Sequence, residues 1–272
     1  MHGAKPSRTA LRVAAHRAAH QILESGRIFA DPLALRILGD HPPESQDPRM
    51  RLWVAARSRF AEDALAAAVE RGARQLVVLG AGLDTFAYRN PFADLRVFEV
   101  DHPATQAWKR ELLGRAGIAE PDSLVYAAID FHRDSLAGAL ASAGFEAEQQ
   151  TFFTWLGVVP YLEKPAIWST LEFIGALRGG AHVVCDYPDP PEALTPETRV
   201  YHEKITARVA ALGEPWLSFF DPAELHAKLV QLRFAEIEDL GPRQIAARFF
   251  PARIAATPER GGHLLRATNM TK

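Results

Sequence analysis

The segment VVLGAGLDTFAYR, residues 77–89, decides the fold. It continues a short apolar run, RQLVVLG at residues 74–80, whose length and adjacent valines favour a buried parallel strand. Gly80 and Gly82 follow at once, where the chain must turn sharply and expose backbone N–H groups. Glycine permits such a turn and lets a ligand approach the main chain closely. The segment therefore predicts the first strand of an open sheet, followed by a ligand-binding turn at Gly80, Ala81 and Gly82.

Apolar runs of strand length recur after this segment and alternate with helical stretches. The runs are LRVFEV (95–100), LVYAAI (124–129), TFFTWLG (151–157) and AHVVCDY (181–187). Helical stretches lie between most of them, at 104–116, 134–143 and 165–178. This alternation predicts an α/β fold, a parallel sheet with helices on both faces. The two late strands, 234–240 and 261–268, have no clear crossover helix between them, so we expect an antiparallel last strand.

Composition and charge argue against several classes of protein. The chain has 272 residues, 48% of them hydrophobic and 24% charged, which is typical of a globular protein. Its net charge of −2 argues against a nucleic-acid partner, because proteins that bind nucleic acids carry a clustered excess of basic residues. No segment reaches the ~20 apolar residues of a membrane span, and the first residues lack the apolar core of a secretory signal. The lone Cys185 fits a reducing compartment, so we predict a cytoplasmic protein; the oligomeric state is left open.

The residues after the two glycines distinguish between kinds of ligand. Thr85 stands where the dinucleotide fingerprint G-x-G-x-x-G has its third glycine, which disfavours NAD. Asp84 lies inside the turn, where a carboxylate repels phosphate groups. The same carboxylate is suited to the cationic amino-acid end of S-adenosylmethionine. The turn therefore favours S-adenosylmethionine over a dinucleotide.

Acidic residues at the next two strand ends add candidate nucleoside contacts. Glu99 and Asp101 belong to FEVD, about 20 residues after the turn, where an acid typically bonds a ribose diol. Asp130 and Phe131 follow the next strand, where a carboxylate can accept from the adenine amino group while an aromatic ring packs on the base. The alternative for each acid is a solvated loop carboxylate, and the alternative for the glycine turn is an unliganded loop. Three consecutive strand ends with such residues nevertheless favour a nucleoside-containing cofactor.

The chain also carries an ordered set of motifs. They are PSRTALRVAAHRAAH, RSRFAEDAL, GAGLDTFAYR, VFEVDHP with a downstream Lys109, DF, and WLGVVPYL. In this order they resemble the leucine carboxyl methyltransferase family, and most closely its bacterial branch of S-adenosylmethionine-dependent methyltransferases. The resemblance runs from about Pro6 to the final strand.

The resemblance implies a class I methyltransferase fold, which is Rossmann-like, with a seven-stranded sheet and an antiparallel last strand. It implies that Gly80, Asp101 and the pair Asp130-Phe131 match positions that bind S-adenosylmethionine. An arginine on the preceding helix would meet the methionine carboxylate, for which we choose Arg57 over Arg59. Eukaryotic members have a glutamate at the fourth strand end, where this chain has Leu156. At most a backbone contact from Leu156 or Gly157 is then expected there.

We expect a single methyltransferase domain over residues 1–272. Its parts are an N-terminal helical segment (1–72), a cofactor-binding core (73–187), an insertion toward the acceptor site (188–220) and C-terminal strands (221–272). By the same resemblance, residues 1 to about 25 form a helical lid over the cofactor. We expect this lid to be mobile and to have few buried contacts, because its amphipathicity is modest.

The predicted activity is O-methylation of a carboxylate or hydroxyl on a small molecule. A carboxylate acceptor needs no general base, and the family precedent of carboxyl methylation favours one; a cation would then hold it. Arginines in the C-terminal third that could do so are Arg199, Arg243, Arg248 and Arg253. A hydroxyl acceptor would require a base within hydrogen-bond reach, and the candidates are Tyr161, His202 and Glu203.

Two other functions and a metal site are alternatives to this prediction. A nicotinamide-dependent oxidoreductase is disfavoured by Asp84 and Thr85. A non-catalytic nucleoside-binding protein of the same fold stays open, because methyltransferases often need no side-chain catalyst. His16 and His20 have i, i+4 spacing but lack the glutamate and third ligand of a zinc motif, so no metal is predicted.

Overall fold

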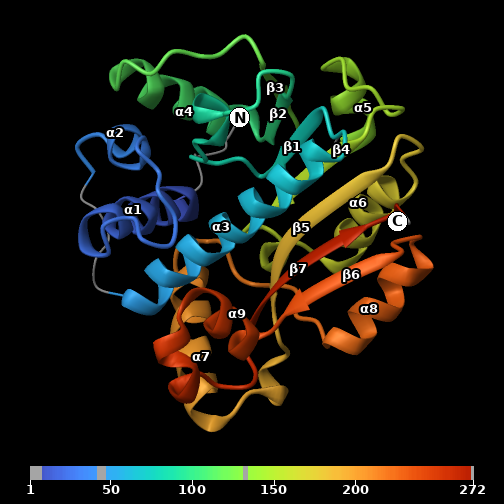
Figure 1. The fold of residues 1–272 in the computed structure, drawn as a ribbon. Coiled ribbons are helices and arrows are strands. Elements are labelled where there is room, and N and C mark those ends of the chain that lie inside the picture. Colours follow the sequence, from blue (N-terminus) through green and yellow to red (C-terminus); the bar gives the residue numbers. More distant parts are fainter. Residues whose placement is uncertain (1–7, 42–46, 131–133, 271–272) are drawn as a thin grey trace. The chain divides into compact units, whose positions relative to one another are not determined.

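The computed structural model describes residues 8–41, 47–130 and 134–270. Within these residues the strands form a seven-stranded sheet in the order β3-β2-β1-β4-β5-β7-β6 (Figure 1). The strands are β1 (Gln75–Leu79), β2 (Arg96–Asp101), β3 (Leu124–Ala128), β4 (Thr151–Trp155), β5 (Ala181–Pro188), β6 (Glu236–Leu240) and β7 (Gly262–Thr268). By contacts the chain divides into two compact units, Met1–Glu146 and Ala147–Lys272, each taken in turn below. The prediction of one domain over the whole chain stays a prediction.

The first unit contains three parallel strands and the helices around them. Strand β1 pairs in parallel with β2, and β2 with β3. Every residue of β1 is buried, as expected for an apolar run inside a parallel sheet. The helices are α1 (Arg8–Leu23), α2 (Ala34–Leu38), α3 (Pro48–Glu70), α4 (Pro103–Arg115) and α5 (Leu136–Ser142), with a 3-10 turn η1 (Phe86–Arg89) after the glycines.

Helix α3 begins at a capped position. The side chain of Asp47 accepts hydrogen bonds from the backbone N–H groups of Arg49 and Met50, and Pro48 occupies the first helical position. Both features stabilise a helix start, because the first N–H groups of a helix have no partner within it. The helix ends shortly before Gly72, whose φ of 109° only glycine adopts readily.

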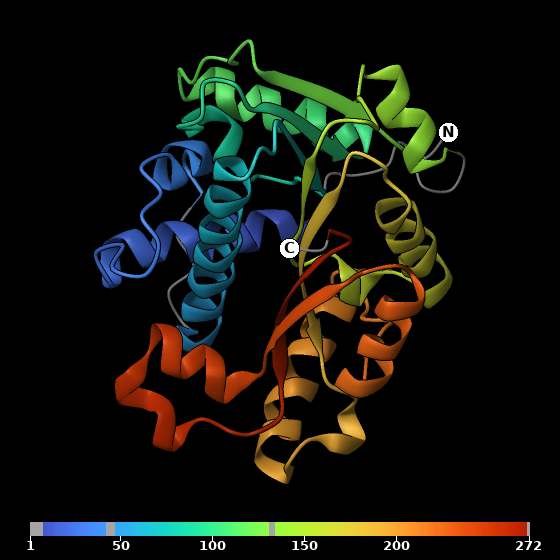
Figure 2. The same ribbon diagram turned by 45° about the vertical axis from the view of Figure 1, so that its right-hand side comes forward.

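Helix α1 is a packed part of the first unit. Its Ala14, Ala15 and Ala18 lie in one cluster with residues of α2 and α4, such as Ile37 and Leu113. Figures 1 and 2 both show α1 beside α2 and α3. The expectation that this segment has few buried contacts is wrong, because alanines give a weak apolar signal yet allow close helix packing. Whether α1 closes over a cofactor stays a prediction.

The second unit contains the antiparallel end of the sheet. Strand β4 pairs in parallel with β5, whereas β7 runs antiparallel to both β5 and β6. The helices are α6 (Lys164–Gly175), α7 (Pro196–Ala210), α8 (Pro222–Gln231) and α9 (Pro242–Phe249), with 3-10 turns η2 (Val159–Tyr161), η3 (Pro191–Ala193) and η4 (Pro251–Ala256). Helix α7 lies within the stretch expected to be an insertion, residues 188–220. The antiparallel last strand is confirmed, and α9 with η4 occupies the stretch that showed no clear helix.

In the part of the chain that the structure describes, no helix is both long and apolar enough to cross a membrane.

Candidate functional site

The turn after β1 has the backbone conformation that its glycines predicted. Gly80 and Gly82 have φ angles of 64° and 48°, in the left-handed region that favours glycine. A Cβ atom on Gly82 would lie 3.1 Å from the Cβ of Ala10 on α1, so a side chain at this position would also crowd that helix. The N–H groups of Gly80 and Ala81 donate to the Val100 carbonyl of β2 at 2.8 and 3.2 Å. The turn is thereby tied to the neighbouring strand.

Asp101, the last residue of β2, lies against this turn. Its Oδ2 accepts a hydrogen bond from the Gly82 N–H at 2.7 Å, and its Oδ1 accepts one from the His102 N–H at 2.6 Å. Burial raises the pKa of Asp101, and the bonds to these two N–H groups oppose that rise. The residue is partly exposed, and a carboxylate has about four acceptor positions. Asp101 therefore keeps capacity to accept from a ligand.

Glu99, two residues earlier on β2, has a different environment. Its side chain is 1% exposed, and its Oε2 accepts from the Nζ of Lys109 on α4 at 2.7 Å. The other oxygen, Oε1, is buried and has no hydrogen-bond partner in the structure. Burial raises the pKa of Glu99 to about 7, although Lys109 opposes the shift. Of the two acids in FEVD, Asp101 is the partly exposed one at the turn, and Glu99 is half of a buried ion pair.

Asp84 remains an anion inside the turn. Its Oδ1 accepts from the Phe86 N–H at 2.8 Å, and its Oδ2 lies 4.0 Å from Nη1 of Arg17. Its partly enclosed position raises the pKa of Asp84, but the charges of Arg17, Lys109 and Arg89 outweigh this, so the pKa lies below its usual value. With a third of its side chain exposed, Asp84 can offer negative charge to a cationic ligand group.

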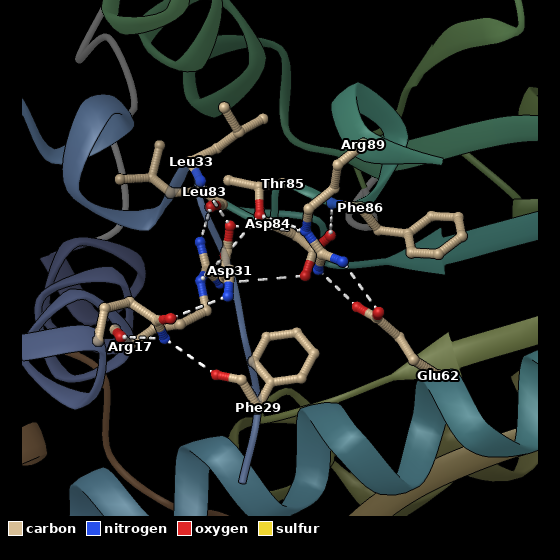
Figure 3. Close-up of polar contacts among 11 residues, drawn as sticks. Arg17, Phe29, Asp31, Leu33, Glu62, Leu83, Asp84, Thr85, Phe86 and Arg89 are labelled. Carbon is tan, nitrogen blue, oxygen red and sulfur yellow. Dashed lines mark hydrogen bonds and ion pairs between the residues drawn. The ribbon is translucent and has the colours of Figure 1, made fainter. Parts of the chain in front are cut away.

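A buried polar network fixes the turn to α1, and the sequence did not predict it (Figure 3). Arg17 of α1 donates from Nη2 to the Leu83 carbonyl at 2.5 Å, and its Nε lies 2.8 Å from Oδ2 of Asp31. Asp31 is fully buried and also accepts from the Thr85 hydroxyl at 2.6 Å. The Thr85 hydroxyl thus makes a structural hydrogen bond to Asp31 at a position where a dinucleotide-binding protein would have glycine.

The network continues from Thr85 to α3. The Nε of Arg89 donates to the Thr85 hydroxyl at 3.2 Å, and the guanidinium binds both carboxylate oxygens of Glu62 at 2.9 and 2.5 Å. The same guanidinium lies over the rings of Phe29 and Phe86, 5.1 and 5.7 Å from their centroids. Such planar, two-bonded contacts orient a side chain strongly. The turn is therefore held by charged groups from α1 and α3 as well as by its glycines.

The two arginines considered for the methionine carboxylate differ in exposure. Arg57 on α3 is buried, with 6% of its surface exposed. The Arg59 side chain is 51% exposed and pairs with Asp63 on the same helix at 2.7 Å. The helix register therefore favours Arg57 as the inward-facing residue, and its role stays a prediction.

The remaining predicted cofactor contacts are less well defined. Asp130 follows β3 and is partly exposed; its backbone N–H donates to Asp134 at 2.9 Å. Phe131 lies outside the described residues. Leu156 follows β4 in the second unit, and the next N–H, that of Gly157, donates to Asp186 at 2.5 Å. That backbone group is therefore already bonded within its own unit.

The candidate acceptor residues of the second unit separate into two groups. Tyr161 and His202 both contact the ring of Trp216, whereas Glu203 is exposed. Arg199 donates to three backbone carbonyls around η3, Arg243 pairs with Glu259, Arg248 pairs with Glu238, and Arg253 is exposed. Three of the four arginines thus have partners inside the protein.

His16 and His20 are both buried on α1, and His20 Nδ1 lies 3.1 Å from Glu24. Among the described residues there is no group of three or more His, Cys, Asp or Glu side chains that could hold a metal ion.

Sequence comparison identifies the family. Residues 10–175 match the sequence profile described as "Leucine carboxyl methyltransferase". The chain belongs to the leucine carboxyl methyltransferase family. It is 35% identical over 220 residues to the "Putative S-adenosyl-L-methionine-dependent methyltransferase YktD" of Bacillus subtilis, covering 76% of this chain and 72% of that protein. A relative of the same description from a Mycobacterium species (strain KMS) is 30% identical over 266 residues, covering 88% of this chain and 79% of the relative.

Solved structures support the fold of this family member. A "putative methyltransferase" from Thermobifida fusca superposes with a TM-score of 0.59 at 15% identity, over 98% of this chain and 96% of that one. A geranyl diphosphate methyltransferase in complex with GPP and sinefungin gives a TM-score of 0.50 at 15% identity, over 89% and 84% of the two chains. The class I methyltransferase fold expected from the sequence is confirmed.

Proposed function

We propose that the chain transfers the methyl group of S-adenosylmethionine to a carboxylate or hydroxyl oxygen of a small molecule. Methyl transfer from S-adenosylmethionine follows from membership of the family and from the relatives named for that activity. The oxygen acceptor and its small size are the proposed part. We assign the activity to the cytoplasm, since the single cysteine fits a reducing compartment.

The observation that supports S-adenosylmethionine as the methyl donor in this proposal is the position of Asp101. A partly exposed carboxylate, fixed by two backbone N–H groups at the end of β2, is suited to bond a ribose diol. The turn at Gly80 and Gly82 lets a ligand approach the main chain closely, and the anionic Asp84 suits an ammonium group. These residues fit S-adenosylmethionine.

The other predicted residues that the structure describes would each have a part in this arrangement. Arg57 would meet the methionine carboxylate, Ala81 would offer backbone contacts, and Asp130 would accept from the adenine amino group. Glu99 would support the site through Lys109, with which it forms a buried pair at 2.7 Å. Leu156 would contribute at most a backbone contact.

S-adenosylmethionine supplies a methyl group that is already activated on a sulfonium, so the protein's task is to orient the acceptor and exclude water. A carboxylate acceptor is a competent nucleophile at neutral pH. A hydroxyl acceptor requires a group that takes its proton. Family precedent supports a carboxylate, whereas the internal pairing of Arg199, Arg243 and Arg248 leaves fewer cations to hold one.

The structural role of Thr85 weakens the nicotinamide alternative. Its hydroxyl bonds the buried Asp31, and the adjacent anion Asp84 would repel a pyrophosphate. A non-catalytic protein that binds S-adenosylmethionine is the second alternative. It predicts the same binding without turnover.

The proposal is tested by ligand binding and by methyl release. S-adenosylhomocysteine should raise the melting temperature, because a ligand that binds only the folded state stabilises it by mass action. NAD and NADP should leave it unchanged. Incubation with S-adenosylmethionine and panels of small carboxylic acids and phenols should then release S-adenosylhomocysteine. A shift with NAD alone would overturn the proposal, and binding without turnover across the panels would favour the non-catalytic alternative.

A further inference from the structure

Four aromatic side chains of the second unit form a cluster that the cofactor contacts do not explain. Tyr161 follows β4 in η2, His202 lies on α7, and Trp216 and Phe219 lie on the irregular segment before α8. The ring centroid of His202 is 5.4 Å from that of Trp216 and 5.4 Å from that of Phe219, and Tyr161 lies 6.4 Å from Trp216. We call these four residues the His202 cluster. All four are partly exposed.

Backbone hydrogen bonds hold this cluster at the end of a parallel strand. The N–H groups of Leu217 and Ser218 both donate to the carbonyl of Pro160 in η2, at 2.6 and 3.2 Å. The Ser218 hydroxyl donates to the Leu162 carbonyl at 2.6 Å. The segment that carries Trp216 is thereby fastened to the turn that follows β4. In open α/β sheets, ligands bind beyond the carboxyl ends of the parallel strands.

Two nitrogen atoms inside the cluster lack partners among the described residues. Nε2 of His202 and Nε1 of Trp216 are both buried, and no described residue forms a hydrogen bond with either. Buried polar atoms are nearly always bonded, and an indole N–H usually finds an acceptor when it is buried. Elsewhere in the same unit, Tyr187 and His263 both bond Asp239. The two unbonded nitrogens therefore require an explanation.

We propose that the His202 cluster binds the methyl acceptor, and that the acceptor presents an aromatic hydroxyl group to it. This inference rests on the proposed function and names its substrate class. The Trp216 N–H can only donate, so the ligand atom beside it must be an acceptor such as oxygen. Nε2 of His202 can accept the proton of that same hydroxyl. Rings that present both faces and edges are suited to hold an aromatic ligand by stacking.

The protonation state of His202 favours a hydroxyl over a carboxylate. Burial lowers the pKa of His202, although the charge of Glu203 opposes the shift. The imidazole is therefore neutral near pH 7 and can act as a base, the role that a hydroxyl acceptor requires and a carboxylate does not. In the reaction, the hydroxyl oxygen bonds the methyl carbon while the carbon–sulfur bond breaks, its electron pair stays on sulfur, and the hydroxyl proton passes to Nε2 of His202.

Access to the two nitrogens requires movement of the segment between α7 and Trp216. Residues 211–215 belong to neither a helix nor a strand, and Gly213 within them has a φ of 82°. Loops of this kind are the usual place for motions that admit a ligand. A hydroxyl that bonds both nitrogens would supply the hydrogen bonds for which the described residues offer no partner.

Isothermal titration without S-adenosylmethionine tests the binding step. The probes are 2-naphthol, 2-naphthoate and 2-methylnaphthalene, which present the same ring with a hydroxyl, a carboxylate or neither. We expect 2-naphthol to bind best and its affinity to fall at least tenfold in Trp216→Phe, which keeps an aromatic ring and removes the N–H. Trp168→Phe is the matched control, because Trp168 packs on Phe220 outside the cluster. If 2-naphthol does not bind, or if both variants lose the same affinity for it, the cluster is not the acceptor site. If 2-naphthoate binds more tightly than 2-naphthol, the acceptor group is not a hydroxyl.

Turnover of 2-naphthol, followed as release of S-adenosylhomocysteine, tests the role of His202. His202→Gln should lower kcat about 100-fold or more, the usual contribution of a general base, and change KM much less. The control is His226→Gln, the same exchange on α8, which should leave kcat within about twofold of the wild type. Equal kcat in wild type and His202→Gln would show that His202 is not the general base. Failure of S-adenosylhomocysteine to bind would overturn the proposed function, whereas loss of naphthol binding alone would overturn only this inference.

Discussion

The carboxylate of Asp101 accepts a hydrogen bond from the backbone N–H of Gly82, with 2.7 Å between Oδ2 and the nitrogen. The last residue of β2 thereby holds the turn that follows β1. One side chain connects the shape of the glycine turn with the carboxylate proposed to bind the ribose. A change at position 101 should therefore alter both the stability of the turn and the affinity for the cofactor.

Replacement of Asp101 by alanine should weaken S-adenosylhomocysteine binding at least tenfold. The diol hydroxyls would donate to the carboxylate, and one hydrogen bond to a charged group contributes roughly 1.5–3 kcal/mol. The unfolding free energy should fall by about 1–2 kcal/mol, because the N–H groups of Gly82 and His102 lose a charged acceptor. Titration calorimetry and urea denaturation measure the two effects. Unchanged affinity in Asp101→Ala, with loss in Glu99→Gln, would make Glu99 the ribose ligand instead.

Replacement of Arg57 by lysine should weaken S-adenosylhomocysteine binding about tenfold with little change in stability. Lysine keeps the charge but loses the forked, two-bonded geometry that suits a carboxylate. Arg59→Lys is the matched control on the same helix, and its exposed pair with Asp63 contributes at most about 1 kcal/mol. If Arg59→Lys lowers the affinity and Arg57→Lys does not, Arg59 is the residue of α3 that binds the methionine carboxylate.

Replacement of Arg17 by methionine should destabilise the protein by about 3–5 kcal/mol, the usual cost of removing one partner of a buried ion pair. Asp31, fully buried, would keep its bonds from Thr85 and Leu33 but lose its closest cation, which lies at 2.8 Å. Arg59→Met, which breaks an exposed pair, should cost less than about 1 kcal/mol. Chemical denaturation of both variants makes the comparison, and equal losses would contradict the structural role of Arg17.

The hydrogen bond between Arg17 and the Leu83 carbonyl allows a test of the predicted lid. If α1 closes over the cofactor, S-adenosylhomocysteine should slow hydrogen exchange in residues 8–23, because Arg17 holds α1 to the Leu83 carbonyl in the cofactor turn. Unchanged protection, measured by mass spectrometry with and without the ligand, would leave α1 as a fixed structural helix.

Local patterns in the sequence predicted much of the fold and the turn. The alternation of apolar runs and helices fixed the order of elements, and two glycines directly after a strand have a conformation that other residues rarely adopt. The role of Asp101 as a candidate ribose ligand could also be predicted, since an acid at the second strand end has a known spacing from such a turn.

The network around Asp31 could not be predicted from the sequence, for a physical reason. Arg17 and Thr85 lie 14 residues before and 54 residues after Asp31, and a contact between distant side chains leaves no periodic signal. The burial of α1 was missed because alanines such as Ala14 and Ala18 contribute little to amphipathicity. The sequence likewise does not predict the contact of His202 with Trp216, although it gives His202 as one of three candidate bases, with Tyr161 and Glu203.

His263 on β7 is the centre of a pH-dependent cluster in the second unit. Its Nδ1 lies 2.9 Å from Asp239, and its Nε2 lies 3.3 Å from Asp189, so both ring nitrogens face carboxylates. Tyr187 and His226 also bond Asp239, and Arg260 pairs with Asp189. Burial alone would lower the pKa of His263, but its bonds to the two carboxylates outweigh this and raise the pKa to about 9.

The raised pKa predicts a loss of stability at alkaline pH. A histidine with a pKa near 6.5 when unfolded and about 9 when folded binds its proton more tightly in the folded state. Its contribution is complete below pH 6.5 and is lost as the pH rises through 9, by at most about 3 kcal/mol. Urea denaturation between pH 6 and 9.5 should show this decline in the wild type and a much flatter profile in His263→Gln. His226→Gln, a neighbour on the same carboxylate, should keep the decline, and the same slope in His263→Gln would assign it to another group.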